Sequence, residues 1–276
     1  MPDNLTDLPD ELLIFLLVFI SPTTGVKLSS TCRRLRSVLV HEIHVSVRIQ
    51  NYPRQEQMHE MCALWKRAQS LTIDNINLQD PHLEICGQLR HLRQIRFLWC
   101  KEYSITKRGL SKLCLHSLTS LTVDGGGPVK NRLLAMLPLM EQLQCIVIAG
   151  FPFTEKTVAC LNQCPRLTQL VLQHVSLRPC TDLLTKFIRQ NQISYLDVAG
   201  CRNVRKQTIQ LLATSCSSLR TFRFNTEYED SRRWLDDVRR RKFFQGRAIE
   251  RTIENNKKWG VMVITFQMAE TLSDDG

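Results

Sequence analysis

One spacing pattern recurs through most of this chain and limits its fold more than any other feature. Apolar residues stand at the first, fourth and sixth places of a short segment, and seven such segments begin 24 to 26 residues apart. They are Ala68-Leu71-Ile73, Leu92-Ile95-Phe97, Leu118-Leu121-Val123, Leu143-Ile146-Ile148, Leu167-Leu170-Leu172, Ile193-Leu196-Val198 and Leu219-Phe222-Phe224. A near-constant period of this length indicates stacked repeats, because one such unit cannot bury its apolar face alone.

In spacing and period the segments resemble leucine-rich repeats. Each unit would be a short strand followed by a helix, and neighbouring units would stack into a curved α/β solenoid with one parallel sheet. The stretches between segments agree, since residues 155–164 and 206–216 carry apolar residues at helical spacing. An eighth segment, Val40-Ile43-Val45, is predicted to be a capping strand at the start of the array.

Several cysteines stand at particular places of the repeat. Cys100 and Cys201 occupy the ninth place of their segments, where Asn or Cys turns the chain out of the strand. Cys164 and Cys216 each stand three residues before the next segment begins. The stretch Cys164-Pro165-Arg166-Leu167 resembles the end of a cysteine-containing leucine-rich repeat.

The residues between the framework positions should lie on the open, concave face of the sheet, because side chains alternate along a strand. Aromatic and Arg side chains dominate the binding energy of many protein interfaces. We therefore predict that a target protein is bound by Gln94, Arg96, Trp99, Gln169, Gln173, Tyr195, Asp197 and Arg223. Trp99, Arg96, Tyr195 and Arg223 are the first choices, although each could equally be an ordinary solvated or edge-packed side chain.

The chain begins with a different kind of segment. Residues 8–38 read LPDELLIFLLVFISPTTGVKLSSTCRRLRSV, and residues 12–20 are apolar without a break. Such a helix has no polar face and must be covered on more than one side, which about 35 residues cannot do alone. Each large apolar side chain left in water costs about 1.5–3 kcal/mol. The segment therefore predicts a partner surface, or alternatively a small helical cap on the array.

The flanks of this apolar run argue against export. The run is preceded by four acidic residues, Asp3, Asp7, Asp10 and Glu11, whereas a signal peptide carries positive charge at this place. Nine apolar residues are also too few to span a bilayer. We therefore expect no membrane partner and a cytoplasmic or nuclear protein. Eleven cysteines scattered without a C-x-x-C pair agree with reduced thiols in those compartments.

The opening segment also resembles a known family. Leu8-Pro9-Asp10-Glu11-Leu12-Leu13, an apolar helix, and Cys32-Arg33-Arg34-Leu35-Arg36 about twenty residues on resemble an F-box. The resemblance implies a three-helix module that docks on the Skp adaptor of cullin–RING ubiquitin ligases. On this reading the adaptor-binding residues are Leu8, Pro9, Leu12, Leu13, Leu16, Leu17, Val26, Leu28, Cys32, Arg33 and Leu35.

The segment departs from the family pattern at three places. Thr24 stands where an Asp cap is usual, Gly25 where a Leu is usual, and Leu35 where a Trp is usual. These changes bear on the affinity of the module for its adaptor. The cysteine-containing repeats are the subclass usually joined to an F-box, so the two resemblances support each other by their order.

Five parts are predicted along the chain: an F-box module at 1–39, about seven repeats plus a capping strand at 40–226, a basic helical segment at 227–259, a C-terminal capping strand at 260–268 and a disordered tail at 269–276. The net charge is +11, and residues 231–258 alone hold ten Lys/Arg against four Asp/Glu. More than half of the excess positive charge is therefore confined to one segment.

Motifs of catalysis are missing from the sequence. There is no G-x-S-x-G, no H-E-x-x-H and no phosphate-binding loop, so we expect no enzyme and no cofactor. Cys160 with Cys164, and His41 with His44, lack further ligands at zinc spacing, and we expect no metal there. The glycine-rich turn at 124–128 lacks a following Lys-Ser/Thr and is predicted to be a flexible loop.

Together these patterns predict a substrate-recognition subunit of an SCF-type cullin–RING E3 ubiquitin ligase. The F-box would bind the Skp adaptor, and the concave face of the repeats would bind an unknown target protein. The alternative is a non-enzymatic repeat scaffold that binds RNA or acidic partners through the basic C-terminal segment. Nucleic acid is the less favoured partner, because this segment lacks the interleaved aromatic residues of single-strand binders.

Overall fold

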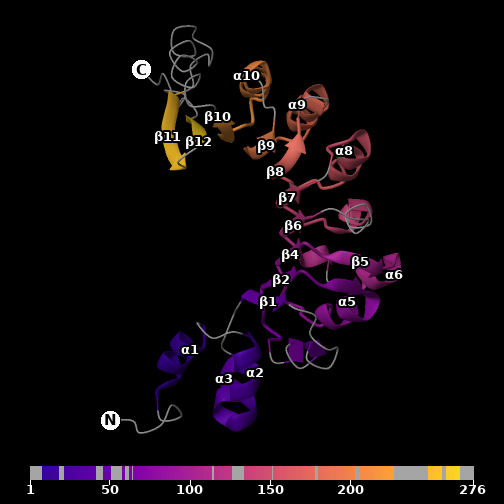
Figure 1. Ribbon diagram of the computed structural model, residues 1–276, viewed down its shortest axis with the longest axis vertical. Coiled ribbons are helices and arrows are strands. Elements are labelled where there is room, and N and C mark those ends of the chain that lie inside the picture. The colour runs from indigo at the N-terminus through magenta and orange to yellow at the C-terminus, as the bar shows by residue number, and fades with distance from the viewer. Residues whose placement is uncertain are drawn as a thin grey trace, which may run out of the picture. The chain divides into compact units, whose positions relative to one another are not determined.

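The computed structural model describes residues 8–18, 22–41, 46–50, 58–59, 62–63, 65–113, 115–125, 134–150, 152–177, 180–202, 206–226, 248–256 and 259–267. The chain divides into two compact units, Met1–Leu143 and Gln144–Gly276, here called unit 1 and unit 2. In each unit, strands form a sheet and the repeat helices lie on one of its faces (Figure 1).

Unit 1 opens with three helices and continues with parallel strands. The helices are α1 (Asp10–Val18), α2 (Pro22–Thr31) and α3 (Arg33–His41). The strands β1 (Ser46–Gln50), β2 (Ser70–Asp74), β4 (Gln94–Leu98) and β6 (Ser120–Asp124) pair in parallel in that order. A small second sheet joins β3 (Asn77–Gln79) to β5 (Lys101–Ser104). The connections contain α5 (Asp80–Cys86), α6 (Lys107–Ser111) and the 3-10 helices η2 (Leu115–Ser117) and η3 (Leu137–Leu139).

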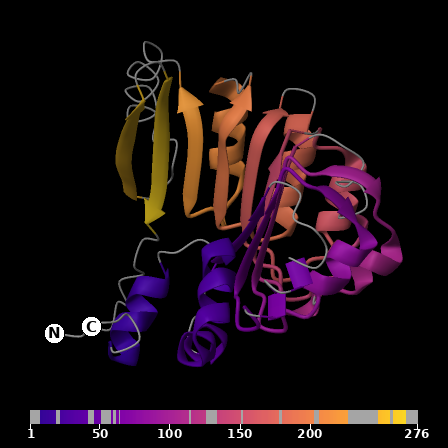
Figure 2. The same cartoon turned by 60° about the horizontal axis from the view of Figure 1, so that its bottom comes forward.

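Unit 2 continues the pattern of strands and helices. The strands β7 (Cys145–Ala149), β8 (Gln169–Ser176), β9 (Tyr195–Arg202) and β10 (Thr221–Thr226) pair in parallel. The helices between them are α8 (Glu155–Leu161), α9 (Thr181–Gln190) and α10 (Lys206–Ser215). Two antiparallel strands, β12 (Trp259–Gln267) and β11 (Ala248–Asn256), follow β10 at the end of the sheet, and Figure 2 shows them in yellow.

The apolar framework of the seven segments forms the core of the repeats. None of its residues is more than 3% exposed. The framework residues also face each other across the strands, as Leu71 lies opposite Ile95 in unit 1 and Leu170 lies opposite Leu196 in unit 2. Repeating parallel strands with a helix in the connection and this buried spacing make the leucine-rich repeat fold, which confirms the prediction for the array.

The eighth segment was predicted at the wrong place. Val40 belongs to α3, and the strand is β1, which begins at Ser46. Val47 and Ile49 are buried opposite Leu71 and Ile73, so they hold the fourth and sixth framework places. Helix α3 extends to His41 because its buried residues keep helical spacing, which moves the strand further along the chain.

The C-terminal part also differs from prediction. Residues 248–256 form the strand β11 instead of continuing a basic helix. Its pairing with β12 is antiparallel, so the sheet of unit 2 is not purely parallel. Ile249, Thr252 and Ile253 are β-branched, which favours a strand over a helix. A strand is present at the predicted place as β12, but β11 and not β12 is the last strand of the sheet, so the predicted capping role falls to β11. Residues 227–247 and the predicted tail at 269–276 lie outside the described residues.

A left-handed residue directly follows β2, β4, β6 and β7, and another lies inside β8 at the same repeat place. The eighth residue of each of these segments has a positive φ: Asn75 (52°), Trp99 (52°), Gly125 (110°), Gly150 (76°) and His174 (55°). At three of these places the backbone N–H donates to the neighbouring strand: from Asn75 to the Leu98 carbonyl, from Trp99 to the Asp124 carbonyl and from Gly150 to the Gln173 carbonyl, each at 2.9 Å. Gly and Asn adopt this conformation with little strain, whereas bulky residues do not.

Both cysteines at the ninth place bond back to the preceding repeat, although Cys201 still lies inside β9 and does not end the strand as predicted. The Cys100 thiol donates to the Ile73 carbonyl at 3.3 Å, and the Cys201 thiol donates to the Leu172 carbonyl at 3.2 Å. Each acceptor lies at the sixth place of the preceding repeat. Burial raises the pKa of Cys100 to about 11 and that of Cys201 to about 12, so both thiols stay protonated donors at neutral pH.

The left-handed turn gives a direct test of the repeat geometry. We expect Gly150→Ala to lower the free energy of unfolding of unit 2 by about 1–2 kcal/mol, because a Cβ is strained at φ 76°. His174→Asn, at the same repeat place, should change it by less than about 0.5 kcal/mol. Urea unfolding followed by circular dichroism measures both variants, and equal effects would contradict the assignment of this place.

Candidate interaction surfaces

Helix α1 has one buried and one exposed apolar face. Leu13 is fully buried, and so are Leu35 and Val38 of α3, which contacts α1. On the other face Leu12, Phe15 and Leu16 are 50%, 62% and 43% exposed. Their spacing of three and four residues places them side by side on the helix. We call these three side chains the α1 apolar face.

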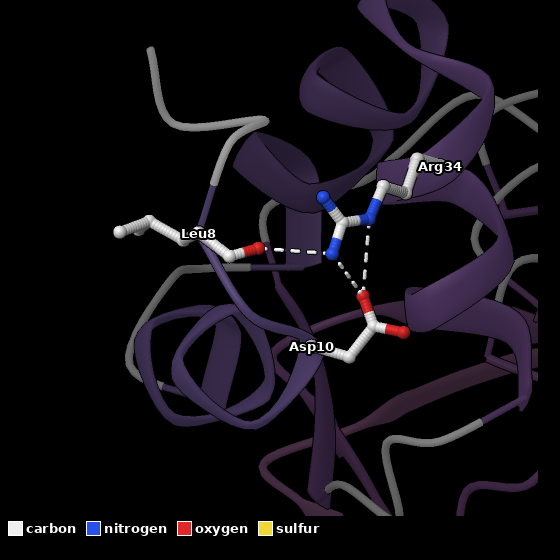
Figure 3. A network of polar contacts seen from close by, with 3 residues as sticks. All are labelled: Leu8, Asp10 and Arg34. Carbon is white, nitrogen blue, oxygen red and sulfur yellow. Dashed lines mark hydrogen bonds and ion pairs between the residues drawn. The ribbon is translucent and has the colours of Figure 1, made fainter. Parts of the chain in front are cut away.

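An ion pair fixes the start of α1 on α3 (Figure 3). Arg34 donates from Nε and Nη2 to Asp10 Oδ1 at 3.1 and 2.7 Å, and its Nη2 also donates to the Leu8 carbonyl at 2.9 Å. Both side chains are exposed, so the pair contributes only about 0–1 kcal/mol to stability. Its main effect is on orientation, because one guanidinium holds both the turn before α1 and its first residue.

The predicted adaptor-binding residues fall into three groups. The first group reaches the surface: its exposed members are Pro9, Leu12, Leu16 and Arg33, and its half-buried members are Leu8, Leu28 and Cys32. Leu13 and Leu35 are buried inside the module, so they position its helices and offer no contact surface. The side chains of Leu17 and Val26 lie outside the described residues.

Two further points correct the sequence-based view of this module. Phe15 is the most exposed residue of the α1 apolar face and was not among the predicted contacts, although its spacing from Leu12 and Leu16 could have indicated it. Thr24, predicted as a cap, lies inside α2, which begins at Pro22. Proline suits the first position of a helix because it lacks the N–H that would be unpaired there.

On the open face of unit 1, β4 carries two of the predicted target contacts, and a third follows its last residue. Gln94 and Arg96 are exposed and alternate with buried Ile95 and Phe97. Trp99 follows directly and is 61% exposed. This part of the prediction placed all three side chains on an accessible surface.

Trp99 is the unusual residue of this surface. It adopts the left-handed conformation, and a Cβ added to the neighbouring Gly125 would come within 3.1 Å of the Trp99 Cα. A bulky residue in this conformation costs about 1–2 kcal/mol. The fold does not require tryptophan here, since Asn75 and Gly150 hold the same place in other repeats. Local strain of this kind is commonly associated with function.

The open face of unit 2 carries the other predicted contacts. Gln169 is exposed and Gln173 is half-buried. Asp197, in contrast, is only 5% exposed. It therefore acts within the sheet and does not offer a contact, which corrects its predicted role.

Asp197 organises its neighbours on β9 and β10. Its Oδ2 accepts from Arg223 Nη1 at 3.2 Å, and its Oδ1 accepts from the Ala199 N–H at 2.8 Å. Burial and the Asp197 charge raise the pKa of Tyr195, while a hydrogen bond and the charge of Arg223 act in the opposite direction. Tyr195 and Arg223 stay partly exposed, so the cluster presents two oriented side chains.

Other predicted features lie partly outside the described residues. In the ranges that the structure describes, no group of His, Cys, Asp or Glu could hold a metal ion. Within the same ranges, every helix is too short or too polar to cross a membrane. Cys164 is buried with a pKa raised to about 12, and His44 falls in an undescribed stretch. Residues 126–128 of the glycine-rich turn and most of the basic segment are likewise not described.

Comparison with known proteins adds one structural likeness. No protein-family model matches the sequence, and no curated protein matches it. Among solved structures, an internalin from Listeria monocytogenes is similar, with 11% identity and a TM-score of 0.33. The match covers 65% of this chain and 55% of that chain, so this chain spans about half the length of the internalin. A likeness at this level does not indicate function. The leucine-rich repeat fold is shown by the parallel strands and the buried framework residues.

The Asp197 cluster predicts a stability effect. Asp197→Ala should lower the free energy of unfolding of unit 2 by about 1–3 kcal/mol, because it removes the acceptor of both Arg223 and the Ala199 N–H. Asp197→Asn keeps an oxygen for the Ala199 N–H and should cost less. Asp182→Ala, an exposed change in the first turn of α9, is the control, with a cost below about 1 kcal/mol. If urea unfolding gave the three variants the same midpoint, the organising role of Asp197 would be refuted.

Proposed function

We propose that this chain is a non-enzymatic substrate-recognition subunit of an SCF-type cullin–RING E3 ubiquitin ligase. Helices α1–α3 would be an F-box that docks on the Skp adaptor, and the open faces of the strands would bind a target protein. The observation that carries the proposal is the α1 apolar face, which stands directly behind the Leu8-Pro9-Asp10-Glu11 start of the F-box pattern.

Energetics support a partner for the α1 apolar face. Fully burying one Leu or Phe side chain contributes about 1.5–3 kcal/mol. Three such side chains together can stabilise a complex considerably, and contiguous exposed apolar residues mark interaction sites in soluble proteins. Asp10 and Glu11 border the face with charges, which gives it the polar rim that many interfaces have.

The alternative of a helical cap accounts for this face less well. Helix α2 contacts β1 and so joins the helices to the repeats. Leu12, Phe15 and Leu16 remain exposed in the presence of those repeats. A module that served only to cover the end of the array would be expected to bury its most apolar helix.

The proposed mechanism is positioning. The F-box end would hold the chain on the ligase, and the repeats would hold a target, which raises the effective concentration of the target near the catalytic subunits. The protein itself would then need no catalytic group. The raised pKa values of the buried thiols agree with inert, reduced cysteines, and we propose a cytoplasmic or nuclear location, as for other components of such ligases.

The α1 apolar face predicts adaptor binding. Phe15→Glu should weaken binding of the full chain to the Skp adaptor more than about tenfold, because it places a charge at the centre of the apolar contact. Since Phe15 is exposed, the variant should keep its folding stability. Titration calorimetry with the purified adaptor measures the affinity.

Leu139→Glu is the matched control for this experiment. Leu139 is 49% exposed on η3 of the same unit but lies outside the three-helix module. Its replacement should leave adaptor binding unchanged. Wild-type affinity in the Phe15→Glu variant, or no measurable binding by the wild-type chain, would remove the proposal.

The ion pair at the start of α1 predicts an effect on orientation. Arg34→Ala should change stability by less than about 1 kcal/mol, because the pair is exposed. It should nevertheless weaken adaptor binding several-fold, since Asp10 and the Leu8 carbonyl lose their common donor. Arg36→Ala, an exposed change on the same helix, is the control. If both arginine variants bound the adaptor equally well, Arg34 would have no positioning role.

A further inference from the structure

The edge at which the strands of unit 1 end brings two carboxylates and an indole together. Asp74, Leu98 and Asp124 lie opposite one another in register on β2, β4 and β6. Neighbouring strands are about 4.8 Å apart, so the two aspartates flank Leu98, one on each side. Trp99 follows Leu98 and continues past the ends of the strands.

Trp99 is joined to Asp124 through its backbone, and its indole lies close to Gly125. The Trp99 N–H donates to the Asp124 carbonyl at 2.9 Å. The next residue, Gly125, packs so closely that an added Cβ would lie 3.7 Å from Cε3 of the indole. One side of the tryptophan therefore rests on a residue without a side chain, while 61% of the residue stays exposed. The indole is held in place and still accessible to a partner.

Positive and negative side chains occupy different positions along the strands of unit 1. Arg48 pairs with Asp74, from Nη2 to Oδ2, at 2.6 Å. Arg96 is exposed on β4, two residues before Leu98 and diagonal to both aspartates. The arginines thus stand before the edge, whereas Asp124 is the last residue of β6 and is joined to Trp99 by a backbone hydrogen bond. An aromatic face attracts cations and repels anions, so the indole and this carboxylate favour the same sign of ligand charge.

From this arrangement we infer that the edge at Trp99 binds a lysine or arginine side chain of the target protein. The cation lies over the indole face and pairs with the Asp124 carboxylate. This inference rests on the proposed recognition of a protein by the open face, and it specifies the chemistry of the target as a basic segment. It also accounts for the strained tryptophan, which occupies a place where Asn75 satisfies the same turn.

The test uses the full chain and short Gly/Ser peptides that carry several lysines, several acetylated lysines or several glutamates at the same spacing. Binding is measured by fluorescence anisotropy of the labelled peptides. The lysine peptide should bind, although the net charge of +11 repels it in general. The acetylated peptide should bind more weakly, because it lacks the cation.

Variants at the edge assign the binding. Trp99→Asn suits the left-handed turn, so the protein should fold, and it should bind the lysine peptide about two- to fivefold more weakly. Asp124→Asn should weaken binding similarly, and Trp99→Tyr should give a smaller loss. Glu84→Gln, which removes an exposed carboxylate on helix α5 of the same unit, is the control and should have no effect.

Two outcomes would overturn the inference: lysine-peptide binding that is unchanged in Trp99→Asn, or loss in that variant of glutamate-peptide binding instead. The inference and the proposed ligase function can fail separately. Trp99→Asn should bind the Skp adaptor normally, and Phe15→Glu should bind the lysine peptide normally.

Discussion

The structure depends on one constraint: the framework residues of a repeat are buried only when a neighbouring repeat covers them. In unit 2, Leu170, Leu196 and Phe222 lie opposite one another in consecutive strands, and each is fully buried. Because these residues hold the stack together, the alternate residues on the open face have little part in stability. They are free to vary with a binding function, apart from the few that interact across strands.

The same constraint makes the ends of an array its weak points, since a terminal strand has no further repeat to cover it. In unit 2, β12 and β11 follow β10 with the opposite direction. This change of direction ends the repeat pattern, because an antiparallel hairpin needs no helix in its connection. In unit 1, β1 follows three helices of a different kind, with α2 in contact with it.

What could be predicted from the sequence follows from these interactions. The framework was predictable because burial recurs at a fixed period, and the accessible face followed from strand alternation. The burial of Asp197 could not be predicted, because it depends on Arg223 in the next strand. The sequence of one segment does not show which residues of the next strand lie beside it. The strand β11 was read as a helix because its charged residues obscure the β-branched ones. Which face of α1 is exposed could not be predicted either, since the sequence of a helix that is apolar all round does not show which side its neighbour covers.

Both proposed binding sites contain residues that depart from what the local fold favours, and this supports a binding role for each site. Sequences that specify a fold usually agree with its local rules, and departures concentrate at functional sites. Leu13 is the buried residue among the described side chains of α1, yet Leu12, Phe15 and Leu16 are apolar as well and stay exposed. The turn after β4 requires a left-handed residue, yet it carries Trp99. Trp99 strains the isolated chain, and the apolar side chains of α1 stay in contact with water. Each departure becomes favourable once a partner covers the side chain. One partner must offer an apolar surface and the other a cation, so the two sites can act on different proteins at the same time.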